Sequence, residues 1–100
     1  MGKNAIIDKD ILGWGNENKD EISKNYVEII KVEGNDPPLP EGTSDPDIAK
    51  YCYDKNCDLF TGDKKFYTDF FENKNVESVL IKKYAYWKTG NKPIFLIKIV

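Results

Sequence analysis

The segment Ala5-Ile6-Ile7-Asp8 places an aspartate directly after a short apolar run near the start of the chain. Such a run predicts a buried strand, so residues 5–8 are expected to form the first strand of a sheet. A carboxylate at the end of a buried strand is costly unless it is paired or bound to a metal ion. Asp8 is therefore either an ordinary surface residue at a strand end or part of a functional site.

Further strands are predicted along the chain from the concentration of β-branched, aromatic or other apolar side chains. These side chains are concentrated at residues 27–32, 57–61 and 76–81. Near the C-terminal end, residues 84–88 and 94–100 are expected to pair as a β-hairpin. The expected turn is Thr89-Gly90-Asn91-Lys92, because a Gly-Asn pair is typical of hairpin turns.

Helices are predicted between the strands. Ser44 or Asp45 suits an N-cap and Pro46 the first turn, so a helix is expected from there to about Lys55, followed by a turn at Asn56. A second helix is expected at residues 64–73, with the phenylalanines inward. Its apolar residues are Phe66, Phe70 and Phe71.

The first connection is less regular. Residues 11–15 contain two glycines and predict a turn. Residues 16–25 are polar and predict a short helix with Ile22 facing inward. Residues 34–44 contain three prolines and two glycines, which indicates a loop.

Alternating strands and helices over 100 residues indicate a single α/β domain spanning residues 1–100. The expected sheet is mainly parallel, has four or five strands, and carries the C-terminal β-hairpin as an antiparallel edge. A hydrophobic fraction of 40% supports a folded chain.

The composition excludes several kinds of chemistry. Histidine is absent, which removes His general bases, Ser–His or Cys–His dyads and His-ligated zinc. Every basic residue is a lysine and the net charge is −2, so the chain is not a generic polyanion binder. Acid–base or metal chemistry would have to use carboxylates, whose oxygens favour Mg²⁺, Mn²⁺ or Ca²⁺.

Cys52 and Cys57 are the two cysteines, and their spacing without a second pair does not suit a structural zinc site. They are expected to be buried thiols in a reducing cytosol, with a disulfide as the alternative if the source is a hyperthermophile. The N-terminal apolar run is too short for a signal peptide or a membrane span. The protein is therefore expected to be cytoplasmic, with no membrane partner.

Carboxylates are predicted to gather at one edge of the sheet, because ligands of open α/β sheets bind outside the carboxyl ends of the strands. Asp8 ends the first strand, Asp63 follows the third, and Asp45 opens the helix before it. Acidic residues at flanking positions are expected to support this group. They are Asp10, Asp47 and Asp69.

Each of these aspartates also has a purely structural interpretation. Asp45 and Asp63 both occupy positions typical of helix caps. The functional interpretation rests on their conjunction, since gathered carboxylates repel one another and a divalent cation relieves that repulsion.

The same motifs resemble those of small PIN-like proteins found among archaeal and bacterial toxin–antitoxin neighbours. Those proteins begin with an apolar strand that ends in Asp, as Ile6-Ile7-Asp8 does. They open a helix with Ser-Asp-x-x-Ile, close to Ser44-Asp45-Pro46-Asp47-Ile48. An apolar strand then runs into Thr-x-Asp-x-x-Phe, matched by residues 61–66. The resemblance covers roughly residues 5–82.

This resemblance implies a PIN-like three-layer sandwich and Mg²⁺- or Mn²⁺-dependent cleavage of single-stranded RNA. It makes Asp8, Asp45 and Asp63 the metal ligands, with Thr61 supporting the site through a hydrogen bond. Neighbouring lysines would hold the RNA backbone electrostatically. They are Lys9, Lys64 and Lys65. A heat-adapted archaeal source and an antitoxin partner would fit the same family.

Two departures lead to an alternative. Family members often carry acidic residues where this chain has Lys9 and Lys65. The alternative is a PIN-like domain without catalysis that binds nucleic acid or a protein partner. The aromatic run Tyr84-Ala85-Tyr86-Trp87 would then form an edge strand suited to self-association as a homodimer, to a protein partner or to base stacking.

A third interpretation is a receiver-like phosphoacceptor domain, which also combines strand-end aspartates with Mg²⁺. It would use Asp8, Asp10 and Asp63 together with Lys82 near a late strand. The chain is short for that fold, and the proline-rich loop fits it poorly.

Overall fold

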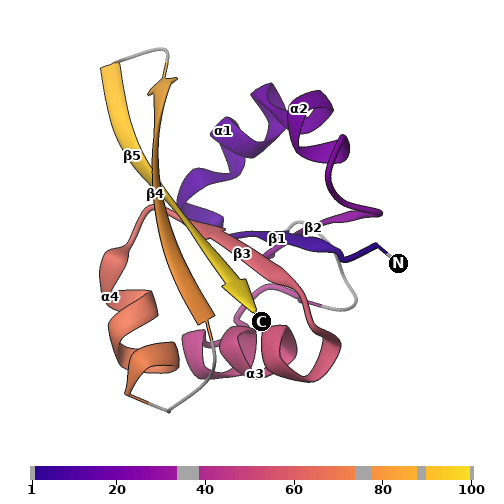
Figure 1. Ribbon diagram of the computed structural model, residues 1–100, viewed down its shortest axis with the longest axis vertical. Helices are drawn as coiled ribbons and strands as arrows, with labels where there is room; N and C mark the ends of the chain where they lie inside the picture. Colours follow the sequence, from indigo (N-terminus) through magenta and orange to yellow (C-terminus); the bar gives the residue numbers. More distant parts are fainter. Residues whose placement is uncertain (1, 34–38, 74–77, 88–89, 100) are drawn as a thin grey trace.

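The computed structural model describes residues 2–33, 39–73, 78–87 and 90–99, and for residues 82–87 and 90–92 it describes the backbone alone (Figure 1). Five strands form one sheet in the order β2-β1-β3-β5-β4. Their bounds are β1 Ala5–Ile7, β2 Ile29–Lys31, β3 Asp58–Thr61, β4 Ser78–Trp87 and β5 Gly90–Ile99.

The sheet is mixed. β1 pairs in parallel with both β2 and β3, whereas β5 is antiparallel to both β3 and β4. The expectation of a mainly parallel sheet is therefore wrong, while the α/β class, the five strands and the C-terminal hairpin are confirmed. The physical reason is that β5 lies between β3 and β4 and is antiparallel to both, so the hairpin adds two antiparallel pairings where one at the edge was expected.

Helices cover both faces of this sheet (Figure 1). One face carries the 3₁₀ helix η1 (Lys9–Ile11) with α1 (Leu12–Glu17) and α2 (Lys19–Ser23). The other carries α3 (Asp45–Lys55), α4 (Lys64–Tyr67) and the π-helical η2 (Thr68–Glu72). No helix in the described ranges is long and apolar enough to cross a membrane.

Strand alternation divides the core into two clusters. In β1, Ile6 packs with the α3 and α4 side, whereas Ala5 and Ile7 pack with the α1 and α2 side. Successive side chains of a strand point to opposite faces, so a fully buried strand of this kind needs apolar residues at every position. The predicted burial of residues 5–7 is confirmed, because all three side chains are inaccessible.

The predicted turn at residues 11–15 is wrong, because this segment is helical from the end of η1 into α1. Gly15 is buried, and a Cβ atom added there would lie 2.8 Å from Cγ2 of Ile7. The glycine that suggested a turn therefore permits close packing of a helix on the strand. The predicted inward orientation of Ile22 is confirmed.

The second helical layer follows local signals closely. Ser44 is the N-cap of α3, and its hydroxyl accepts the Asp47 N–H at 3.4 Å. Asn56 ends the helix in the left-handed conformation with φ 53°, which confirms the predicted turn. Beyond α4, the π turn shifts the helical phase, so Phe71 is fully buried while Phe70 is only partly buried.

The C-terminal hairpin is longer than predicted. The segments expected as a separate fourth strand and a first hairpin strand form the single strand β4, whose described part begins at Ser78. The predicted turn residues Gly90 and Asn91 instead lie in β5, paired with Trp87 and Tyr86. Residues 88–89, between the strands, lie outside the described residues.

β5 extends past the end of its neighbour β3. β3 ends at Thr61, which pairs with Phe95, so residues 90–94 of β5 continue beyond the carboxyl end of β3. Pro93 lies in this extension and pairs only with Tyr84 of β4. A proline is tolerated there because the side away from β4 has no strand to bond.

Both cysteines are buried and free, as the thiol interpretation predicted. Burial raises the pKa of the Cys57 thiol, and the same effect acts on Cys52. Both thiols therefore lie in the core, and their raised pKa disfavours the thiolate form that acts as a nucleophile.

Candidate functional site

The carboxyl end of β1 is the point where the chain order of the sheet reverses. From β1 the chain passes to β2 on one side, and then through α3 to β3 on the other side. Crevices at such switch points are the usual ligand sites of open α/β sheets. Asp8 follows β1 and Thr61 ends β3, so both residues lie at this edge of the sheet, where the sequence predicted them.

Asp8 and Thr61 are joined by a buried hydrogen bond. Thr61 Oγ1 donates to Asp8 Oδ2 at 2.7 Å, and the Lys9 backbone N–H donates to Asp8 Oδ1 at 2.8 Å. Thr61 Oγ1 in turn accepts the Asp63 N–H at 3.1 Å. Thr61 therefore orients the carboxylate of Asp8 and also fixes the backbone that follows β3.

The pKa of Asp8 is raised to about 6, and burial is the largest cause, since only 5% of the residue is exposed. The hydrogen bonds from Thr61 and Lys9 work in the opposite direction, since they stabilise the ionised form. The negative charges of Asp10 and Asp45 raise this pKa further, with Asp10 the stronger of the two. The charges of Asp10 and Asp45 therefore act on the carboxylate of Asp8.

The side chain of Asp10 lies against the end of β3, because the backbone at Gly62 comes close to its carboxylate. The Gly62 N–H donates to Asp10 Oδ1 at 3.4 Å, and a Cβ atom added to Gly62 would lie 2.8 Å from Asp10 Oδ2. From the sequence, Asp10 was expected to have only a supporting role. The glycine after the strand was the available signal, since a glycine often marks a place where another group comes near the backbone.

Asp45 and Asp63 occupy different local positions. Asp45 is half-buried in the first turn of α3, where Ser44 provides the cap, so a cap role for Asp45 itself is wrong. Asp63 is exposed and caps α4, because its Oδ1 accepts the Lys65 N–H at 2.9 Å. The structural role considered for Asp63 is therefore observed.

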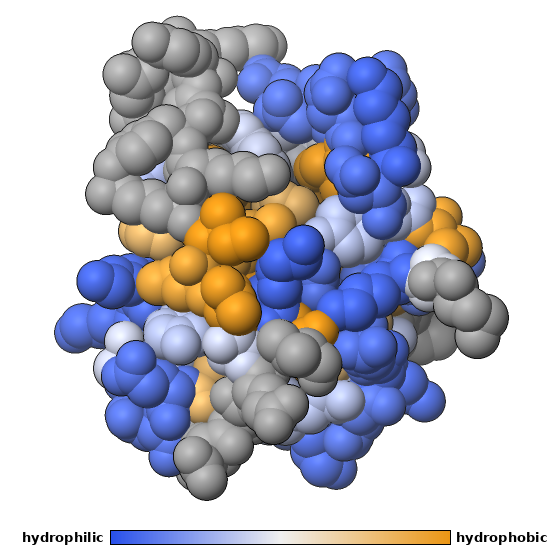
Figure 2. Space-filling view, in the orientation of Figure 1, coloured by the Kyte–Doolittle hydropathy of each residue, from blue (hydrophilic) through white to orange (hydrophobic). Residues whose placement is uncertain are grey.

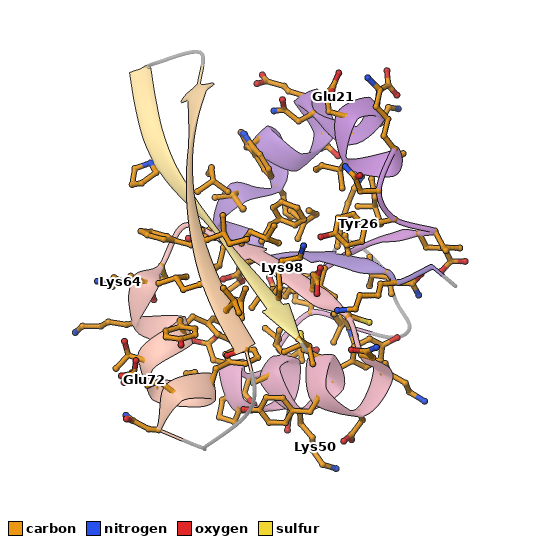
Figure 3. The ribbon with its side chains drawn as sticks, viewed as in Figure 1. Glu21, Tyr26, Lys50, Lys64, Glu72 and Lys98 are labelled. Carbon is orange, nitrogen blue, oxygen red and sulfur yellow. The ribbon has the colours of Figure 1, made fainter. Side chains whose placement is uncertain are left out.

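The remaining predicted residues lie around this centre. Asp47 is exposed in the first turn of α3, and Asp69 is exposed on η2. Lys9 forms an ion pair with Glu33 at 3.8 Å between Nζ and Oε2. Lys64 and Lys65 are exposed on α4, and Figure 3 shows Lys64 pointing away from the molecule.

Within the described ranges, no three His, Cys, Asp or Glu side chains are placed together to hold a metal ion. The chemistry of the donors nevertheless suits a hard cation, since the charges that act on Asp8 are carboxylates. The side chain of Lys82, which the receiver-like interpretation requires, lies outside the described residues.

No protein-family model matches this chain, and neither a curated protein nor a solved structure matches it.

Proposed function

We propose that the protein is a PIN-like, metal-dependent ribonuclease that hydrolyses RNA phosphodiesters at the carboxyl ends of β1 and β3. The observation that supports this most is Asp8, a nearly inaccessible carboxylate whose pKa is about 6. A protein gains no stability from an ionised, buried carboxylate in the field of two others. Such an arrangement is typical of functional sites.

The donor set fits Mg²⁺ or Mn²⁺ better than a softer metal. Asp8, Asp10 and Asp45 are the proposed ligands, and since no three such side chains converge among the described residues, they would have to turn toward one another to hold the cation. Asp63 would lie at the rim, with the lone pairs that its cap leaves available. Bound there, the cation would lower the pKa of a water molecule and stabilise charge on the phosphate. Thr61 keeps Asp8 oriented for this role through its hydrogen bond.

The substrate side of the proposal rests on lysines. Lys64 and Lys65 open α4 beside Asp63, and Lys9 directly follows Asp8. Their charges would hold the phosphate backbone without reading its sequence. Cytoplasmic single-stranded RNA is the proposed substrate, and a role as the toxin of a toxin–antitoxin pair follows from the family resemblance.

The direct test is cleavage of single-stranded RNA by the purified protein with Mg²⁺, Mn²⁺ or EDTA. We expect metal-dependent cleavage that Asp8→Asn abolishes. Asp63→Asn should weaken cleavage while keeping α4 capped, because Asn is as good a cap as Asp. Asp20→Asn, an exposed change on α2, is the control. Cleavage that persists in EDTA, or is unchanged in Asp8→Asn, would contradict the proposal.

The second candidate is a PIN-like module that binds without cleaving. It is favoured by the lack of three converging metal-binding side chains among the described residues and by the ion pair of Lys9 with Glu33. It is also favoured by β4, a ten-residue strand at the edge of the sheet. A free edge of that length can pair with a strand of an antitoxin, another protein or a second copy of the chain.

The two candidates are separated by combining two measurements. RNA binding without cleavage in Mn²⁺, or a dimer in sedimentation analysis with no nuclease activity, supports the binding module. Metal-dependent cleavage by a monomer supports the enzyme.

A further inference from the structure

A pocket of about 680 Å³ opens on the face of the sheet that α1 and α2 cover. It lies between α1 and α2 and the strands β3 and β5, since these elements supply most of its lining. In Figure 3, Lys98 on β5 reaches toward the region beneath α2 on the side where Tyr26 lies. Its volume is in the range of pockets that hold small organic ligands.

The floor of the pocket is aromatic. The rings of Trp14 and Phe60 have centroids 5.5 Å apart, and those of Tyr26 and Phe60 have centroids 5.9 Å apart with nearly perpendicular planes. Leu96 and Ile22 complete the apolar lining and are themselves buried. A floor built in this way favours a planar apolar ligand, which can lie on the aromatic rings.

Four charged side chains line the pocket, namely Lys3, Glu21, Asp58 and Lys98. Lys3 is paired with Asp58 at 3.0 Å, and Glu21 is paired with Lys24 at 3.1 Å. Lys98 also lines the pocket and is exposed, and it forms no ion pair with any described residue. Lys98 is therefore the one lysine of the lining that forms no ion pair with a described residue, and it lies beside an aromatic floor.

We propose that this pocket binds a small aromatic monocarboxylate, with the ring on the floor formed by Trp14, Phe60 and Tyr26 and the carboxylate on Lys98. A single spare ammonium matches a monoanion. A phosphate dianion or a nucleic-acid strand is disfavoured, because Glu21 and Asp58 also line the pocket. The inference is independent of the proposed nuclease site, because none of the residues of that site lines the pocket.

The test is an NMR titration of the full chain with 1-naphthoate as the probe. We expect amide shifts confined to the pocket lining, saturating below millimolar probe. Lys98→Gln should weaken binding about tenfold, the effect of losing one charged hydrogen-bonding partner. The neutral analogue 1-naphthalenemethanol should bind wild type and Lys98→Gln equally.

Lys50→Gln is the matched control, because Lys50 is an exposed lysine on α3, on the far face of the sheet (Figure 3). It should bind 1-naphthoate as wild type does. The amide spectrum of each variant reports whether the fold is retained. The proposal is overturned if millimolar 1-naphthoate shifts no pocket amide, or if Lys98→Gln and Lys50→Gln bind it equally well.

Discussion

Burial, hydrogen bonding and neighbouring charge compete at Asp8. Its pKa in the folded protein is about 6, against an ordinary value of 3.8, because burial outweighs the hydrogen bonds from Thr61 and Lys9. The folded state thus binds the Asp8 proton more tightly than the unfolded state does. The resulting stabilisation is fully present below pH 3.8 and is lost as the pH rises through about 6.

Asp8→Asn should remove this pH dependence. In EDTA, wild type is expected to lose up to about 3 kcal/mol of unfolding free energy between about pH 4 and pH 7, and the variant to lose much less. Urea unfolding across that range measures the difference. Asp20→Asn, at an exposed position, should retain the wild-type profile. An identical slope in wild type and Asp8→Asn would refute a raised pKa at this residue.

Gly15 tests the close contact between α1 and β1. Gly15→Ala should lower stability by about 1–3 kcal/mol, because the new methyl group would overlap Ile7 and overpacking outweighs the gain in helix propensity. Thermal unfolding measures the loss. In an Ile7→Ala background the same substitution should cost almost nothing, since the overlapping atoms are gone. If Gly15→Ala lowered stability equally in both backgrounds, overlap with Ile7 would not be the cause of the loss.

At the scale of elements, α3 is the part of the fold that local sequence signals describe best. Ser44 caps it and Asn56 ends it, because the first offers a hydroxyl to the helix start and the second tolerates a positive φ. The helical segment at residues 11–15 could not be predicted, since Gly15 is explained only by its contact with Ile7. The residues of this segment alone do not reveal that Ile7 of β1 will pack against it.

In the candidate site, too, some features could be predicted from the sequence and others depend on tertiary contacts. The sequence placed Asp8 and Thr61 together, because neighbouring parallel strands end at one edge of a sheet. It did not rank Asp10 above Asp45 in its effect on Asp8, since that depends on how η1 folds back against Gly62. Whether Asp63 caps α4 or turns toward Asp8 is likewise decided by side-chain geometry.

The end of α3 gives an element-scale prediction. Asn56→Ala should destabilise the protein by about 1 kcal/mol, because alanine pays a steric penalty in the left-handed region, and Asn56→Gly should not. Asn73→Ala is the matched control, since Asn73 follows a helix with an ordinary φ of −72°. Chemical denaturation of the three variants measures the effect. Equal losses at both asparagines would show that the backbone conformation of Asn56 is not the cause.

At the scale of the whole molecule, Asp58 ties distant parts of the chain together. It is 1% exposed, and its carboxylate accepts from Lys3 Nζ at 3.0 Å, Tyr26 Oη at 2.7 Å and the Ile99 N–H at 3.1 Å. These donors precede β1, precede β2 and belong to β5. One buried carboxylate therefore links both ends of the described chain to the centre of the sheet.

Asp58→Ala should cost about 3–5 kcal/mol, because it leaves buried donors without their charged acceptor. Tyr26→Phe should cost about 1 kcal/mol in wild type and almost nothing in the Asp58→Ala background. Urea unfolding of this cycle gives the coupling between the two residues. Asp54→Ala, at an exposed position on α3, should change stability by less than about 1 kcal/mol. A comparable loss in Asp54→Ala and Asp58→Ala would show that the buried carboxylate does not organise the fold.

The same network predicts behaviour in alkali. Burial, and then the hydrogen bond to Asp58 and its charge, raise the pKa of Tyr26 above its ordinary value of 10.0. The unfolded chain releases this proton first, so the stabilisation is present below about pH 10 and declines as the pH rises beyond it. Absorbance of tyrosinate should show Tyr26 ionising only with unfolding, and Tyr26→Phe should remove that late component. If every tyrosine ionised before the protein unfolded, the phenol of Tyr26 would not contribute to stability in the way proposed.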